Sequence, residues 1–194
     1  MRDIDIRCQL RKEVRQHHRG ELGTRFVEEL GLCQGIVRVD LAVVNGSVHG
    51  YEIKSEEDTL ARLPGQVEVY NRSLDRVTIV AASAHIKKIE NEKMVPPWWG
   101  IWAAVDSDGI QLEKVREAGE NPHIDAFALA QLLWRDEALQ ALAEKGLDVG
   151  VRSKPREELW RRLVSNLTLN ELGGVVRECL KRRDANWGSA ASQA

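Results

Sequence analysis

Cysteine is scarce in this chain of 194 residues, which contains only Cys8, Cys33 and Cys179. An odd number of cysteines at such wide spacing argues against a disulfide framework, a zinc ribbon and an iron–sulfur cluster. Long apolar runs are also lacking, because none approaches the roughly 20 residues that cross a bilayer. The N-terminus carries charges where a signal peptide needs an apolar stretch. The sequence therefore predicts a cytoplasmic protein with no membrane partner.

Neither sign of charge dominates, since 28 Lys and Arg residues face 30 Asp and Glu residues, and 43% of the chain is hydrophobic. This composition is typical of a soluble globular protein. The charge is unevenly distributed, because nine Lys or Arg residues stand against five Asp or Glu residues from Gly150 onward. A basic C-terminal region permits contact with nucleic-acid phosphates, and a solvated basic helix explains it equally well.

The N-terminal third is expected to contain two helices followed by a hairpin. Ile6, Leu10 and Val14 repeat every four residues, as on one face of a helix, and a second helix is expected over about residues 21–32. The two β-rich runs that follow, residues 37–44 and 47–54, flank Asn45-Gly46. Asn-Gly between such runs is the strongest short signal for a β-hairpin.

The rest of the chain separates into an α/β part and a helical part. A helix capped by Asp58 should kink or restart at Pro64-Gly65. The further elements expected are a strand at 76–82, a polar helix at 86–94, a hairpin over 98–115, and helices from 125 to 183 with breaks near 146–154 and at Gly173-Gly174. We expect a core over residues 1–120, a helical C-terminal region over 121–187 and a disordered tail over 188–194.

Three charged residues interrupt the apolar runs of the first hairpin: Asp40, Glu52 and Lys54. Burying a carboxylate or an ammonium group is costly unless a partner is present. A divalent cation held by Asp40 and Glu52, with Lys54 beside the substrate, would satisfy all three groups. Each also has a plainer explanation, as a strand-edge carboxylate for Asp40 and a cross-strand ion pair for Glu52 and Lys54.

The length of the hairpin loop decides whether the three side chains can meet. A two-residue Asn45-Gly46 loop would pair Asp40 with Tyr51 and place it on the opposite face from Glu52. A three-residue loop, or a bulge near Gly50, would bring Asp40 to the face of Glu52. Asn-Gly is compatible with either loop.

The combination of Val39-Asp40, Glu52-Ile53-Lys54 on the next strand, and Gln66 and Tyr70 on the following helix resembles the PD-(D/E)XK nuclease superfamily. The spacing of Gln66 and Tyr70 is similar to that of its RecB-like branch. Residues 38–80 are similar to a bacterial and phage family within that superfamily. The resemblance is strong over about residues 20–85 and looser over the helical tail.

This resemblance implies a restriction-endonuclease-like α/β core, a mixed sheet flanked by helices, and hydrolysis of DNA phosphodiester bonds by an activated water. Asp40 and Glu52 match the metal-binding carboxylates, with the Ile53 carbonyl as a further ligand. Lys54 matches the lysine that positions the attacking water, and Gln66 would orient Lys54 or a phosphate. Oxygen ligands suit Mg²⁺ or Mn²⁺, and the cysteine spacing of cluster-containing relatives is absent.

Two further sets of residues are assigned to the proposed nuclease. The helix carboxylate of the superfamily corresponds to Glu28 or Glu29, and Glu29 is chosen as a metal ligand because it leans toward the expected apolar face. The nucleic-acid contacts expected are Tyr70, Arg62, Arg152, Lys154 and Arg156. Residues 138–164 resemble the SAP helix–extended loop–helix DNA-binding module, and an ordinary helical hairpin is the alternative.

Three classes of function stay open at this point. The leading hypothesis is a Mg²⁺-dependent deoxyribonuclease, with RNA as a second substrate class and a homodimer as an open assembly. A nucleic-acid-binding or assembly module with the same fold, which cuts nothing, is the second. A purely structural α/β domain, in which Tyr70 is a core residue, is the third.

Overall fold

A computed structural model describes residues 1–183 and contains a six-stranded mixed sheet with its strands in chain order. The strands are β1 (Arg25–Leu32), β2 (Val37–Val44), β3 (Val48–Lys54), β4 (Arg76–Ala82), β5 (Gly100–Asp106) and β6 (Ile110–Arg116). Strand β2 is antiparallel to both β1 and β3. Strand β4 is parallel to both β3 and β5, and β6 is antiparallel to β5. The fold is therefore α/β, as expected.

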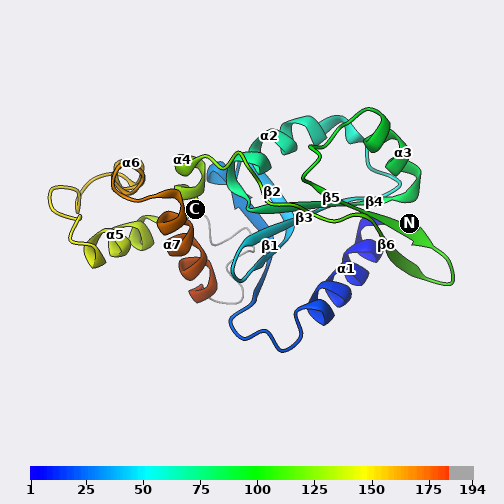
Figure 1. The fold of residues 1–194 in the computed structure, drawn as a ribbon, viewed down its shortest axis with the longest axis horizontal. Helices are drawn as coiled ribbons and strands as arrows, with labels where there is room; N and C mark the ends of the chain where they lie inside the picture. The colour runs from blue at the N-terminus through cyan, green and yellow to red at the C-terminus, as the bar shows by residue number, and fades with distance from the viewer. Residues whose placement is uncertain (184–194) are drawn as a thin grey trace.

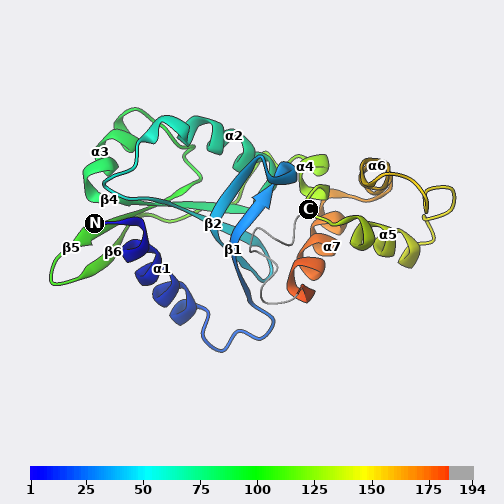
Figure 2. The same cartoon turned by 180° about the vertical axis from the view of Figure 1, so that it is seen from behind.

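Helices lie on both faces of this sheet and at one end of it (Figures 1 and 2). The helices are α1 (Asp3–His17), α2 (Leu63–Ser73), α3 (Ser83–Asn91), α4 (Ala126–Ala130), α5 (Arg135–Glu144), α6 (Arg156–Asn166) and α7 (Leu169–Arg182), with short 3-10 turns η1 (Cys33–Gly35) and η2 (Leu60–Arg62). In both views α2 and α3 lie on one face, α1 lies on the other, and α4 to α7 form a group at one end.

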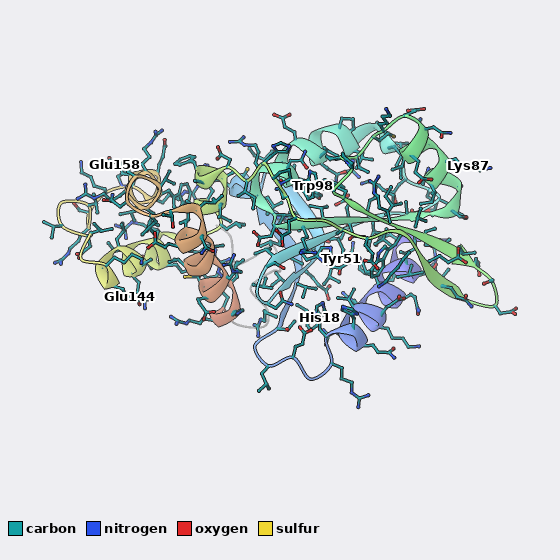
Figure 3. All side chains as sticks on the ribbon, viewed as in Figure 1. His18, Tyr51, Lys87, Trp98, Glu144 and Glu158 are labelled. Carbon is teal, nitrogen blue, oxygen red and sulfur yellow. The ribbon has the colours of Figure 1, made fainter. Side chains whose placement is uncertain are left out.

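Each face of the sheet is covered by its own apolar cluster. Ile6, Leu10 and Val14 of α1 pack against Tyr51, Ile53 and other residues of one face, and Figure 3 shows Tyr51 on the side of the sheet that faces α1. The other cluster joins the α2 and α3 face to the helices α4 to α7. The C-terminal helices therefore share their apolar core with the sheet, and the division into residues 1–120 and 121–187 stays a prediction.

The first hairpin closes with a three-residue loop. Val44 pairs with Val48, so residues 45–47 form the turn, and the Asn45 side chain accepts a hydrogen bond from the Ser47 backbone N–H at 3.1 Å. This register places Asp40 opposite Glu52 instead of Tyr51, which itself pairs with Leu41. The hairpin prediction is confirmed. The three-residue loop places Asp40 on the same face of the sheet as Glu52 and Lys54.

The helix expected over residues 21–32 is wrong, because residues Arg25–Leu32 form strand β1 and Leu22 is fully exposed. Glu29 has a φ of 52°, so the alternation of β1 shifts there and Val27 and Leu30 reach the same apolar cluster. A spacing of three between buried residues resembles a helix face. Pairing with β2 along the strand overrides that local pattern.

Other predicted elements are confirmed with adjusted boundaries. The strand at 76–82 and the closing hairpin form β4, β5 and β6, and α2 restarts at Leu63 after the turn η2. Asp58 accepts hydrogen bonds from Ser55, so it closes a turn before η2 and does not cap a helix. Helix α7 continues through Gly173-Gly174, where a break was expected, and the break lies before Thr168, which caps α7.

Two further expectations concern the chain ends and the membrane. The disordered tail predicted over residues 188–194 lies outside the described residues. Within residues 1–183, no helix is both long and apolar enough to cross a bilayer.

His49 is expected to make stability depend on pH. Its ring stacks on Tyr51 and its Nε2 lies 2.9 Å from the Thr78 hydroxyl, and burial lowers the pKa of His49 to about 3. The unfolded chain takes up a proton near pH 6.5 while the folded protein does not, so the free energy of unfolding should fall by about 2 kcal/mol between pH 6.5 and pH 5. Urea unfolding at both pH values measures this loss.

The matched variants for this experiment are His49→Gln and His123→Gln, since the His123 ring is exposed. His49→Gln should flatten the dependence on pH by the same amount, whereas His123→Gln should leave it unchanged. An unaltered slope in His49→Gln would show that another group governs the acid sensitivity.

Candidate functional site

A cavity of about 890 Å³ lies at the point where β2, β3, η1, η2 and α2 meet. Asp40, Glu52, Ile53 and Lys54 form part of its wall, together with Gln66 from α2. Three elements, β2, β3 and α2, thus bring these sequence-selected residues to one place. Tyr70 stands behind this wall, fully buried on α2.

Glu52 is the centre of a buried hydrogen-bond network. Its side chain is 3% exposed, and Lys54 donates to Oε1 at 2.6 Å from the same face of β3. Gln66 Nε2 also donates to Oε1 at 2.5 Å, and the Tyr70 hydroxyl lies 2.5 Å from Oε2. The Tyr70 hydroxyl is 2.9 Å from the Arg38 carbonyl as well. Gln66 and Tyr70, one helical turn apart, therefore both hold the strand carboxylate.

Asp40 has partners on two sides. Its Oδ2 accepts a hydrogen bond from the Ile53 backbone N–H at 2.7 Å, which ties β2 to β3 beside Glu52. Its Oδ1 accepts from Nη2 of Arg7 at 2.6 Å, and Nη1 of Arg7 also reaches the Asp40 carbonyl at 3.2 Å. Asp40 is thus held by a guanidinium from α1, a partner that the sequence analysis did not identify.

Arg7 joins two further carboxylates to this centre. Its Nε lies 3.1 Å from Asp3 Oδ1, one helical turn earlier, and its Nη1 lies 3.2 Å from Glu29 Oε1 on β1. Asp3 and Glu29 both line the cavity. The only sequence signal was the i, i+4 spacing of Asp3 and Arg7, which usually marks an exposed helix pair.

Glu29, which was chosen over Glu28 as the helix carboxylate, lies in the cavity wall but on a strand. Both residues belong to strand β1, so neither is a helix carboxylate. Glu28 forms an ion pair with Arg11 and does not line the cavity. The acidic residues that helices present to the cavity are Asp3 of α1 and Glu68 of α2.

Burial governs the electrostatics of the paired carboxylates. Loss of solvation raises the pKa of Glu52, and the neighbouring Asp40 raises it further. Burial also raises the pKa of Asp40, against the lowering effects of the Ile53 N–H and Arg7. Burial opposes the charge on Arg7, but its ion pairs with Asp3 and Asp40 raise the pKa of the guanidinium overall. A positive charge bound next to the two carboxylates would therefore stabilise their ionised forms.

The predicted nucleic-acid contacts are not all close to the cavity. Arg62 is exposed and lines it, and Arg156 of α6 donates to the Gln34 side chain of η1 at 2.7 Å. Arg152 and Lys154 instead lie in the turn before α6, where they pair with Asp148 and Glu158. The structure brings Arg62 and Arg156 near the cavity and leaves Arg152 and Lys154 in ion pairs of the helical region.

The acidic residues offer a limited but compatible set of ligands for a cation. Within residues 1–183, no three His, Cys, Asp or Glu side chains converge as a metal-binding group. Two carboxylates present about eight lone-pair positions, and the hydrogen bonds that Asp40 and Glu52 accept from the described residues use five of them. The donor set is all oxygen, which suits Mg²⁺ or Mn²⁺ with water completing the shell.

Comparison with known proteins identifies one family. The family described as Bacteriophage P4 protein cII matches residues 5–190. Protein cII of Enterobacteria phage P4 is 25% identical over 159 residues, which are 81% of this chain and 59% of the relative. The chain therefore spans less than two thirds of that relative's length. No solved structure matches the chain.

Proposed function

The chain belongs to the bacteriophage P4 protein cII family, and we propose that within this family it is a metal-dependent nuclease with a restriction-endonuclease-like core. The observation that carries the proposal is the buried Glu52–Lys54 pair next to Asp40 in the wall of an open cavity. Two carboxylates and an ammonium group at one such place are costly to bury for packing alone. They match in type and order the residues of the PD-(D/E)XK resemblance.

Asp40, Glu52 and the carbonyl of Ile53 would hold the cation, Mg²⁺ or Mn²⁺. A divalent cation bound by them would stabilise negative charge on a phosphate oxygen and lower the pKa of a bound water. Arg7, itself held by Asp3 and Glu29, would keep the Asp40 carboxylate in place for this arrangement.

The remaining residues position the reactants. The Lys54 ammonium donates to Glu52 and would place its other N–H groups toward an attacking water and the charge that develops on the phosphate. Gln66 Oε1 is buried and has no hydrogen-bond partner among the described residues, so it can accept a hydrogen bond from that water and orient it. Tyr70 fixes the orientation of Glu52.

DNA is the proposed substrate, held through its phosphates. Arg38, Arg62 and Arg72 line the cavity and are exposed, so they can meet a backbone that crosses its opening. Arg156, beside η1, would extend this basic border toward α6. Phosphate contacts of this kind position a strand without reading its sequence.

Removal of metal should abolish cleavage. The purified chain is incubated with linear or circular duplex DNA, single-stranded DNA or RNA in millimolar Mg²⁺ or Mn²⁺, and again with excess EDTA. We expect DNA cleavage only with the metal, because the carboxylates have no other means of activating water here. Cleavage of RNA alone would change the substrate, and no cleavage of any substrate would contradict the proposal.

A binding or assembly module is the second candidate, and one observation favours it. All four oxygens of Asp40 and Glu52 already have a protein donor, with Arg7 and Lys54 supplying the positive charges. Such a site is stable without a cation. Metal-independent binding of DNA without cleavage, in the same assay series, would favour this candidate.

A further inference from the structure

Arg7 places a positive charge directly on one carboxylate of the proposed cation site. Its guanidinium contacts Asp40 Oδ1 at 2.6 Å, which is the same carboxylate that would bind the cation. Its side chain is 14% exposed and that of Asp40 is 18% exposed, so solvent screens this pair only weakly. Asp3 and Glu29 bind the other edges of the guanidinium and keep it in place.

The charged side chains in contact around Arg7 show how it affects the binding of a cation. When ionised, Asp3, Glu29, Asp40 and Glu52 carry four negative charges, and Arg7 and Lys54 carry two positive charges. One divalent cation would neutralise the remainder. A larger negative excess, as without Arg7, would attract the cation more strongly.

On the basis of the proposed cation site, we propose that Arg7 and a divalent cation compete for the Asp40 carboxylate. Arg7 is thus a positioning residue that acts through Asp40. It keeps the carboxylate charged, oriented and paired, and it sets the metal concentration at which the site is filled. Asp3 and Glu29 serve mainly to hold Arg7, which explains why these cavity carboxylates converge on a guanidinium.

Direct measurement of Mn²⁺ binding by calorimetry, in the absence of nucleic acid, tests this competition. Arg7→Met should bind Mn²⁺ about tenfold more tightly than the original chain, a change that matches the loss of one charge-assisted hydrogen bond at the competing position. Arg7→Lys retains the charge and should stay within about threefold of the original chain.

Arg11→Met is the matched control, because Arg11 lies one turn further along α1 and pairs with Glu28, outside the cavity. Its Mn²⁺ affinity should be unchanged. Where Arg7→Met folds poorly by circular dichroism, Arg7→Gln also removes the charge, and its rise in melting temperature with added Mn²⁺, set beside that of the original chain, gives the same comparison.

The outcomes separate this competition from the proposed function itself. Equal or weaker Mn²⁺ binding by Arg7→Met, with binding by the original chain intact, would overturn the competition and leave the cation site standing. Absence of Mn²⁺ binding in the original chain and in every variant would overturn the cation site. Tighter binding in Arg7→Met and in Arg11→Met alike would assign the effect to overall charge and also overturn the competition.

Discussion

Replacing Glu52 by glutamine should lower metal-dependent DNA cleavage by about 10³-fold or more, because a cation ligand and several kcal/mol of charge stabilisation are lost together. The glutamine has the same shape, and its amide can still accept from Lys54 and contact the Tyr70 hydroxyl. We expect the fold to be retained, as judged by circular dichroism, although the free energy of unfolding falls because the buried Lys54 ammonium loses its counter-charge. The rate of DNA cleavage at saturating Mg²⁺ or Mn²⁺ is the measurement.

The control for this experiment is Glu90→Gln, which changes an exposed glutamate of α3 away from the cavity. It should cleave DNA at the original rate. Both variants are purified in parallel, so a contaminating nuclease would appear equally in each. Cleavage by Glu52→Gln within tenfold of the original rate would refute the assignment of Glu52.

Replacing Lys54 by methionine should destabilise the protein by about 3 kcal/mol, because it leaves the Glu52 carboxylate buried without a compensating charge. Both side chains of this pair are 3% exposed, so water cannot replace the lost partner. The change in the urea midpoint at constant slope measures the effect. Lys87→Met, on the exposed side of α3 (Figure 3), should change stability by less than about 0.5 kcal/mol.

Two further measurements identify the cause of this loss. Glu52→Gln combined with Lys54→Met removes the solitary charge and should recover most of the stability, which a simple packing defect at Lys54 would not allow. Burial already raises the pKa of Glu52, and loss of Lys54 raises it further. The folded form of Lys54→Met then binds a proton that the unfolded chain releases, so its deficit should shrink as the pH falls toward 4.5. A deficit independent of pH would contradict this explanation.

Local sequence patterns predicted one part of the candidate site and left another part open. Glu52 and Lys54 were predictable as neighbours on one face, because side chains two apart on a strand point the same way. The position of Asp40 depended on whether the Asn45 turn contains two or three residues, and both lengths are compatible with Asn-Gly. The observed pairing of Val44 with Val48 decides between them.

Strand β1 shows where local pattern misleads. The left-handed φ of Glu29 shifts the alternation and places Val27 and Leu30 in the same cluster, a spacing that also fits a helix. Nothing within residues 21–32 distinguishes the two structures. The preference for a strand comes from pairing with β2, a partner that lies later in the chain.

Four features could be predicted from local sequence patterns: the α/β class, the first hairpin, the α1 face of Ile6, Leu10 and Val14, and the shared helix face of Gln66 and Tyr70. Each depends on spacing within one or two neighbouring elements. The contact between Arg7 and Asp40 could not be predicted in this way, because these residues are separated by 33 positions and lie on a helix and a strand whose packing no local pattern specifies. A buried carboxylate requires a partner, but its position in the sequence does not identify which distant cation supplies it.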